Sequence, residues 1–177
     1  MLRIFLTNLG KYNEGKLIGE WIELPCTFEE LEEAKERIGI SDEPDENGVY
    51  YEEWFISDYE SDIDGIEIGE YDNLDDLNEL AEDIENLDND EMTALQAFLL
   101  HGDDLEKALE DVQNGDYRIY SGCYTMEDVA REVVEECGYL NSVPENVARY
   151  FDYEAFGRDL DIEGTYYNIE GDMVEIY

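Results

Sequence analysis

Positive charge is the scarcest property of this chain. Its 177 residues include ten lysines and arginines against fifty aspartates and glutamates, which gives a formal net charge of −40. No lysine or arginine lies between Arg37 and Lys107, and the sixty-nine residues between them hold twenty-five acidic ones. Such a surface repels a phosphate backbone, so we exclude direct nucleic-acid binding. A partner bound by electrostatics must itself be strongly positive.

Cysteines and long apolar runs are also scarce. Cys26, Cys123 and Cys137 are odd in number, widely spaced and without a C-x-x-C pair, which favours reduced thiols in a cytoplasmic protein. No apolar run approaches the roughly 18 residues that span a bilayer. The first eight residues are too short and too alternating for a signal peptide. An acidic surface also repels anionic lipid, so no membrane partner is expected.

Catalytic groups are few as well. The single histidine, His101, ends an apolar helical pattern, where the helix dipole favours a cation, so we expect a structural role for it. The chain has no G-x-S-x-G, P-loop, G-x-G-x-x-G or H-E-x-x-H motif. Among fifty acids, some pair falls at a glycosidase spacing by chance. We therefore predict neither an enzyme nor a bound cofactor.

The acidic stretch that ends at Gly65 resembles a calcium loop only superficially. Aligned on this glycine, an EF-hand would have Glu60 at position 1, Glu67 at position 8 and Tyr71 at position 12. The motif needs an Asp, an apolar residue and a bidentate Glu at these positions. We predict no specific metal site there.

What the chain does have is apolar content. High net charge per residue favours disorder, but hydrophobic residues make up 43% of the chain and aromatic residues 12%. Trp21, Trp54 and Phe55 alternate within strand-like segments and are predicted to be core residues. We expect a folded α+β protein.

Residues 1–70 are predicted to form a small antiparallel sheet with one helix. Its three strands are expected at residues 2–7, 17–24 and 50–57. A turn-rich connection is expected at residues 8–15. Thr27 and Glu30 have the spacing of a capping box, so a helix should begin there, with Phe28 on its inner face, and end near Ile38.

Residues 71–115 are predicted to form an acidic, all-helical domain. Helices are expected from Asn73 to Leu87, from Asn89 or Asp90 to Gly102, and from Asp103 or Asp104 to about Gln113. In the first of these, Asp75, Glu79 and Asp83 make like-charge i,i+4 pairs, each costing about 0.2–0.5 kcal/mol. A sequence selected only for stability would place lysines here, so the carboxylates point to a function.

Residues 116–177 are predicted to form a mixed α+β domain. Its expected elements are a strand at 117–121, a helix from Thr125 to Glu136, a helix after Pro144 that bends near Gly157, and a hairpin of residues 165–169 and 173–177. No repeat or low-complexity linker separates the three domains, which we expect to form an elongated string.

The carboxylates as a set have two explanations. One is a solvated surface for high-salt tolerance, which the uneven distribution of lysine and arginine weakens. The other is imitation of DNA. B-DNA carries one charge per ~1.7 Å of its axis, so forty net charges correspond to a duplex roughly 70 Å long, or about 20 base pairs. Two chains end to end would correspond to about 40 base pairs. The candidate phosphate mimics are Asp58, Glu60, Asp62, Asp64, Glu67, Glu70, Asp72, Asp75, Asp76, Glu79, Glu82, Asp83, Glu85, Asp88, Asp90, Glu91, Asp103 and Asp104.

Several stretches carry a resemblance to a known family. They are Asn8-Leu9, Tyr12-Asn13-x-Gly15-x-Leu17-x-Gly19-x-Trp21, Glu53-Trp54-Phe55-Ile56-Ser57-Asp58-Tyr59-Glu60 and Tyr150-Phe151-Asp152-Tyr153-Glu154-Ala155-Phe156-Gly157-Arg158-Asp159-Leu160. With these residues, and over nearly its full length, the chain resembles the ArdA-type antirestriction proteins. None of the stretches is a catalytic motif, so the similarity rests on pattern and length.

The resemblance implies a protein of mobile elements that mimics bent B-DNA. It would occupy the DNA-binding groove of type I restriction-modification enzymes, both in the methyltransferase core and in the full complex. Its three-domain chains would form a curved homodimer. The implied dimer and antirestriction segment contains Tyr150, Phe151, Asp152, Tyr153, Glu154 and Phe156. Arg149 and Arg158 make this segment less acidic than the rest, which favours dimer contact over target contact there.

A function of a different class stays open beside this one. An acidic adaptor or histone-chaperone-like protein would bind basic protein segments, with no preference for a DNA-shaped groove. A compact monomer would favour the adaptor, and a long, curved dimer would favour the mimic.

Added salt should stabilise this chain, because screening weakens its self-repulsion. Raising salt from about 0.01 M to about 0.1 M shortens the Debye length from about 30 Å to about 10 Å. We expect the free energy of unfolding, measured with urea because it is uncharged, to rise over this interval. An unchanged or falling value would contradict a fold limited by like-charge repulsion.

Overall fold

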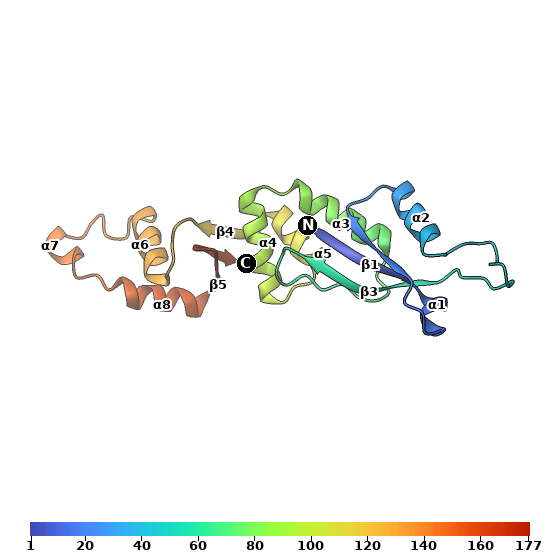
Figure 1. Cartoon of the computed structure of the whole chain (residues 1–177). Coiled ribbons are helices and arrows are strands. Elements are labelled where there is room, and N and C mark those ends of the chain that lie inside the picture. The colour runs from blue at the N-terminus through green and yellow to red at the C-terminus, as the bar shows by residue number, and fades with distance from the viewer. The chain divides into compact units, whose positions relative to one another are not determined.

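The computed structural model of the protein describes every residue from 1 to 177 (Figure 1). Its internal contacts divide the chain into two compact units, Met1–Asn86 and Leu87–Tyr177. Each unit contains a three-stranded antiparallel sheet and helices, which confirms the predicted α+β class. The division into three domains stays a prediction.

The sheet of the first unit has β1 (Leu2–Asn8) at its centre, between β2 (Gly19–Leu24) and β3 (Trp54–Ser61). Both pairings are antiparallel, as expected for the first two strands. Ile4 and Leu6 alternate along β1 and are fully buried. The alternation of apolar residues along β1 therefore identifies the face of the sheet that lies in the core.

The third strand begins at Trp54 rather than at Tyr50. Trp54 pairs with Asn8, the last residue of β1, so the residues before it extend past the end of the neighbouring strand. Tyr51 forms an isolated bridge with Ser41 instead. Of the aromatic residues predicted to be core, Phe55 is buried, while Trp54 and Trp21 are half-buried.

The connection after β1 is a short helix, α1 (Leu9–Asn13), where a turn was predicted. Asn8 explains the difference: its Oδ1 accepts a hydrogen bond from the Lys11 N–H at 2.9 Å, which caps the helix. Asn8 is fully buried, and its Nδ2 donates to the Ile38 carbonyl at 3.1 Å. One amide therefore links the end of β1, the start of α1 and the end of the next helix.

That next helix, α2 (Phe28–Arg37), begins with the predicted capping box of Thr27 and Glu30. It packs on the sheet through Leu31, Ala34 and Ile38, which are buried. Phe28 was predicted to face inward but is 75% exposed. It is the first residue of the helix and follows the end of β2 closely, so it lies beyond the sheet that covers the later turns.

Helix α3 (Leu74–Asn86) confirms the predicted helix after Asn73, whose Oδ1 accepts from the Asp75 N–H at 2.8 Å. Its buried residues, Leu74, Leu77 and Ala81, belong to the core of the first unit, and the helix packs against β2. The side chain of Asn78 accepts a hydrogen bond from the Cys26 N–H at 2.7 Å. This bond attaches α3 to the segment that precedes α2.

The second unit consists of five helices and a sheet. In chain order these are α4 (Asn89–His101), α5 (Leu105–Asn114), β4 (Tyr117–Tyr120), α6 (Met126–Glu136), α7 (Glu145–Ala148), α8 (Tyr153–Glu163), β5 (Thr165–Ile169) and β6 (Asp172–Ile176). The predicted C-terminal hairpin is confirmed, and its second strand, β6, lies at the centre of the sheet between β4 and β5. Helix α4 packs on this sheet, and α6 packs against α8. His101 ends α4, and its Nδ1 lies 2.9 Å from the Tyr167 hydroxyl on β5.

The prediction of a single bent helix after Pro144 is wrong. The structure has two helices there, α7 and α8, and Asp152 caps the second by accepting from the Ala155 N–H at 2.9 Å. Gly157 lies inside α8, where a Cβ added to the glycine would come within 2.3 Å of the Met126 carbonyl oxygen. The glycine therefore allows a close approach between α8 and α6, and it does not mark a bend.

Replacing Asn8 with Ala should destabilise the first unit by about 1–3 kcal/mol, because the Ile38 carbonyl and the Lys11 N–H lose a buried partner. The two tryptophans, Trp21 and Trp54, both lie in this unit, so their fluorescence reports its unfolding in urea. Asn13→Ala, at an exposed position of α1, is the matched control and should change little. Equal effects of the two substitutions would show that the buried amide has no special role.

Candidate functional site: an unpaired acidic surface

The eighteen predicted phosphate mimics lie on β3 and the loop after it, on α3, and at the starts of α4 and α5. All are exposed except Asp72, Glu91 and Asp103, which are half-buried. Their partners in the structure divide them into three groups: acids that accept from backbone N–H groups, acids in ion pairs, and the exposed acids of α3, which have no cationic partner.

The first group stabilises local backbone. Asp88 caps α4, with its Oδ1 accepting from the N–H groups of Asp90 and Glu91 at 2.9 Å. Asp104 caps α5 by accepting from the Lys107 N–H at 2.9 Å. Asp72 accepts from the Gly69 N–H at 2.7 Å. Local structure alone explains why these positions are acidic, since each carboxylate satisfies an otherwise free N–H.

The second group is neutralised. Glu60 pairs with the guanidinium of Arg3 across the sheet, and Asp62 lies 3.2 Å from the N-terminal amine. These are the only two of the eighteen acids in ion pairs, and no ion pair involves any residue from Asp64 to Glu106. Eight of the ten lysines and arginines pair with acids outside that stretch, and the other two, Arg149 and Arg158, make no ion pair.

The third group centres on α3. Its six acidic side chains are all exposed and have no cationic partner: Asp75, Asp76, Glu79, Glu82, Asp83 and Glu85. The predicted like-charge pairs along the helix are therefore present and uncompensated. The buried Leu74, Leu77 and Ala81 fix the opposite face to the first unit, so the backbone that carries these charges is ordered.

The charge density of α3 is close to that of one DNA strand. Thirteen residues make a helix about 20 Å long, so six carboxylates give roughly one charge per 3 Å of axis, against about 3.4 Å along one strand of B-DNA. The six charges are distributed over the exposed side of the helix and do not form a single file. The match is therefore one of density.

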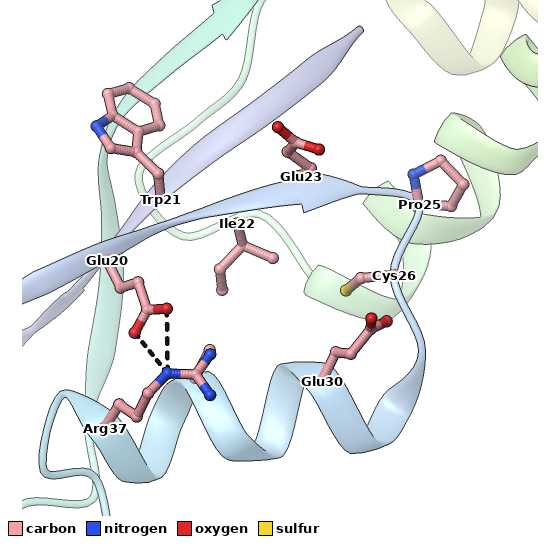
Figure 2. A pocket seen from close by; sticks show the side chains of 9 residues that line it. Glu20, Trp21, Ile22, Glu23, Pro25, Cys26, Glu30 and Arg37 are labelled. Atoms are coloured by element: carbon pink, nitrogen blue, oxygen red, sulfur yellow. Dashed lines mark hydrogen bonds and ion pairs between the residues drawn. The ribbon is translucent and has the colours of Figure 1, made fainter.

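A pocket of about 300 Å³ between β2 and α2 offers a contrast (Figure 2). Here the chain supplies its own cation: the Arg37 Nε donates to both carboxylate oxygens of Glu20, at 3.1 and 2.9 Å. Cys26 also lines this pocket, and burial, followed by the nearby charge of Glu30, raises the pKa of its thiol. A thiol held protonated is a poor nucleophile.

The groups with the largest pKa displacements are structural and lie in the second unit. The hydroxyls of Tyr120 and Tyr166 both donate to the Glu175 carboxylate, at 2.9 and 2.7 Å. Burial, and then this carboxylate, raises the pKa of each tyrosine. Burial and a hydrogen bond to Glu132 raise the pKa of Cys123 to about 11. No cluster of three or more His, Cys, Asp or Glu side chains has the arrangement of a metal site.

The segment from Tyr150 to Phe156 forms an aromatic cluster at the start of α8. The ring of Phe151 lies 4.9 Å from that of Tyr153 and 5.7 Å from that of Phe156. The guanidinium of Arg131 lies 4.3 Å from the centre of the Tyr153 ring. Tyr150 is 75% exposed, Asp152 is the helix cap described above, and Glu154 is exposed.

The architecture thus defines an acidic α+β protein whose distinctive surface is a set of fixed, uncompensated carboxylates. The family model of the antirestriction protein ArdA matches residues 4–175, so the chain belongs to the ArdA family of antirestriction proteins. No curated protein matches the chain. None of its helices is long and apolar enough to cross a membrane.

Tyr120 and Tyr166 should resist ionisation in the folded protein. Because their folded-state pKa values are raised, their contribution to stability is complete below about pH 10, the unfolded value, and is lost as pH rises from there through the folded pKa. In an alkaline titration followed by tyrosinate absorbance, we expect a late phase that coincides with unfolding. Tyr166→Phe should reduce this late phase, whereas Tyr150→Phe, at an exposed position, should leave it unchanged.

Proposed function

We propose that this antirestriction protein is a non-enzymatic mimic of B-DNA that occupies the DNA-binding groove of type I restriction-modification enzymes in the cytoplasm. The observation that carries the proposal is the uncompensated acidic face of α3. A groove built for DNA is lined with positive charge, and fixed anions at the density of phosphates complement it.

The placement of the cations supports this function over a merely solvated surface. Eight of the ten lysines and arginines pair with acids elsewhere in the chain, as Arg37 does with Glu20 and Glu33. On α3 no such partner exists, although each like-charge pair costs about 0.2–0.5 kcal/mol. A positive partner would remove that cost, so the repulsion in the free protein becomes part of the driving force for binding.

We further propose that two chains associate through the C-terminal segment. The helices on either side of the start of this cluster carry exposed apolar residues: Val147 on α7 is 54% exposed, and Ile162 near the end of α8 is 76% exposed. Arg149 and Arg158 are the two cations without an acidic partner. Exposed apolar side chains, together with cations that have no acidic partner, are suited to contact with a second acidic chain.

The decisive experiment compares two variants of equal net charge in competition with DNA for a purified type I methyltransferase core. One replaces the six acids of α3 with amides. The other does the same at six exposed acids outside the candidate set: Glu36, Asp42, Glu43, Glu46, Glu52 and Glu53. We expect the α3 variant to lose roughly tenfold or more in affinity and to show a weaker salt dependence, while the control loses much less.

Two outcomes would count against the proposal. Equal losses from the two variants would mean that only net charge matters. Tight binding to free histones, with no competition against DNA at the methyltransferase, would favour an acidic adaptor of basic protein segments.

A further inference from the structure

A second groove, of about 420 Å³, lies between the first turn of α2 and α3, within the first unit. Its lining residues are Cys26, Thr27, Phe28, Leu31, Asp75, Asn78, Glu79 and Glu82. Leu31 is buried and Phe28 is 75% exposed, so one wall is apolar with an accessible aromatic ring. The other wall carries the carboxylates of Asp75, Glu79 and Glu82, which helical spacing places on one side of α3.

The chemistry of the walls restricts the occupant. An anion is excluded by the three carboxylates, and two N–H groups at the start of α2 already have acceptors: the Glu30 N–H donates to Thr27 Oγ1 at 3.2 Å, and the Thr27 N–H donates to Glu30 Oε2 at 2.8 Å. A purely apolar occupant would strip water from the carboxylates without replacing their hydrogen bonds. The occupant must therefore combine an apolar part with a positive charge.

The neighbouring pocket supplies an internal comparison. There, Arg37 lines the pocket together with Glu20 and Ile22 and donates to the Glu20 carboxylate (Figure 2). The groove between α2 and α3 has the same kinds of lining, acidic and apolar, but no lysine or arginine of the chain enters it. It offers carboxylate acceptors and an apolar surface to a cation from outside.

We propose that this groove receives one arginine side chain of the target protein. The arginine's methylene groups would pack on Leu31 and Phe28, its guanidinium would stack on the Phe28 ring, and its N–H groups would donate to Glu79 and Glu82. Arginine fits better than lysine because its planar group can stack and form two parallel hydrogen bonds at once. The inference rests on the proposed function, since the arginine belongs to the positive target. Stacking of its guanidinium on an aromatic ring is a contact that a DNA phosphate does not offer.

The first test needs no restriction enzyme. Three blocked tripeptides, Gly-Arg-Gly, Gly-Lys-Gly and Gly-citrulline-Gly, are titrated into the labelled full-length protein and followed by amide NMR. We expect the arginine peptide to shift the Asn78 side-chain amide and the backbone around Phe28 most, the lysine peptide less, and the uncharged citrulline peptide least. Shifts spread over all acidic surfaces, or equal responses to arginine and lysine, would overturn the proposal.

The second test uses matched variants on one helix. E79Q/E82Q removes two carboxylates that line the groove, while D83N/E85Q removes two from the same helix that do not. Phe28→Leu keeps an apolar side chain at this exposed position but removes the ring, so it leaves no cavity in the core. We expect E79Q/E82Q to weaken binding of both the arginine peptide and the methyltransferase core by roughly fivefold or more relative to D83N/E85Q, and Phe28→Leu to weaken both as well.

The two proposals fail in different ways. If the unmodified protein does not bind the methyltransferase core, DNA mimicry fails, and the peptide titration still decides whether the groove selects arginine. If the core binds but the two double variants are equally affected, the groove proposal fails while mimicry by overall charge stands.

Discussion

Repulsion between like charges is the constraint on which the rest of this structure depends. With fifty acids and ten lysines and arginines, the fold can compensate only a minority of its carboxylates. Some of the cations join separate segments: Arg3 joins β1 to β3 through Glu60, and Arg37 joins α2 to β2 through Glu20. Backbone N–H groups at the starts of helices neutralise a few more acids, as at Asp88 and Asp104. Helix α3 carries six of the acids that remain uncompensated, and its apolar face holds it to the first unit.

Much of the fold could be predicted because it is encoded locally. The alternation along β1, the capping box of Thr27 and Glu30 and the hairpin near Gly171 depend on neighbouring residues, and the structure has each of them. The errors came from tertiary context. The start of β3 depends on where β1 ends. Gly157 is required by the close approach of α6, and the sequence around the glycine does not show which helix packs there. The amphipathic pattern of α2 placed Phe28 inward because periodicity does not show how far the sheet beneath the helix extends.

The candidate site could be predicted in composition but not in detail. The run without lysine or arginine already located the acidic surface, because ion pairs need a cation within reach. Sequence could not separate carboxylates that cap helices from those that are free, although the spacing of Asp88 and Glu91 is that of a capping box and was a usable signal. The groove beside Phe28 left no sequence signal, since it forms only when α2 and α3, far apart in the chain, pack into the same unit, where the Cys26 N–H donates to Asn78.

The contact between Gly157 and the Met126 carbonyl has a consequence for association. No side chain larger than hydrogen fits there, so α6 and α8 are packed backbone to backbone. The half-buried rings of Phe151, Tyr153 and Phe156 are thereby held on a stiff support. Docking of a second molecule on them would cost little conformational entropy in this segment, which lowers the free-energy cost of association.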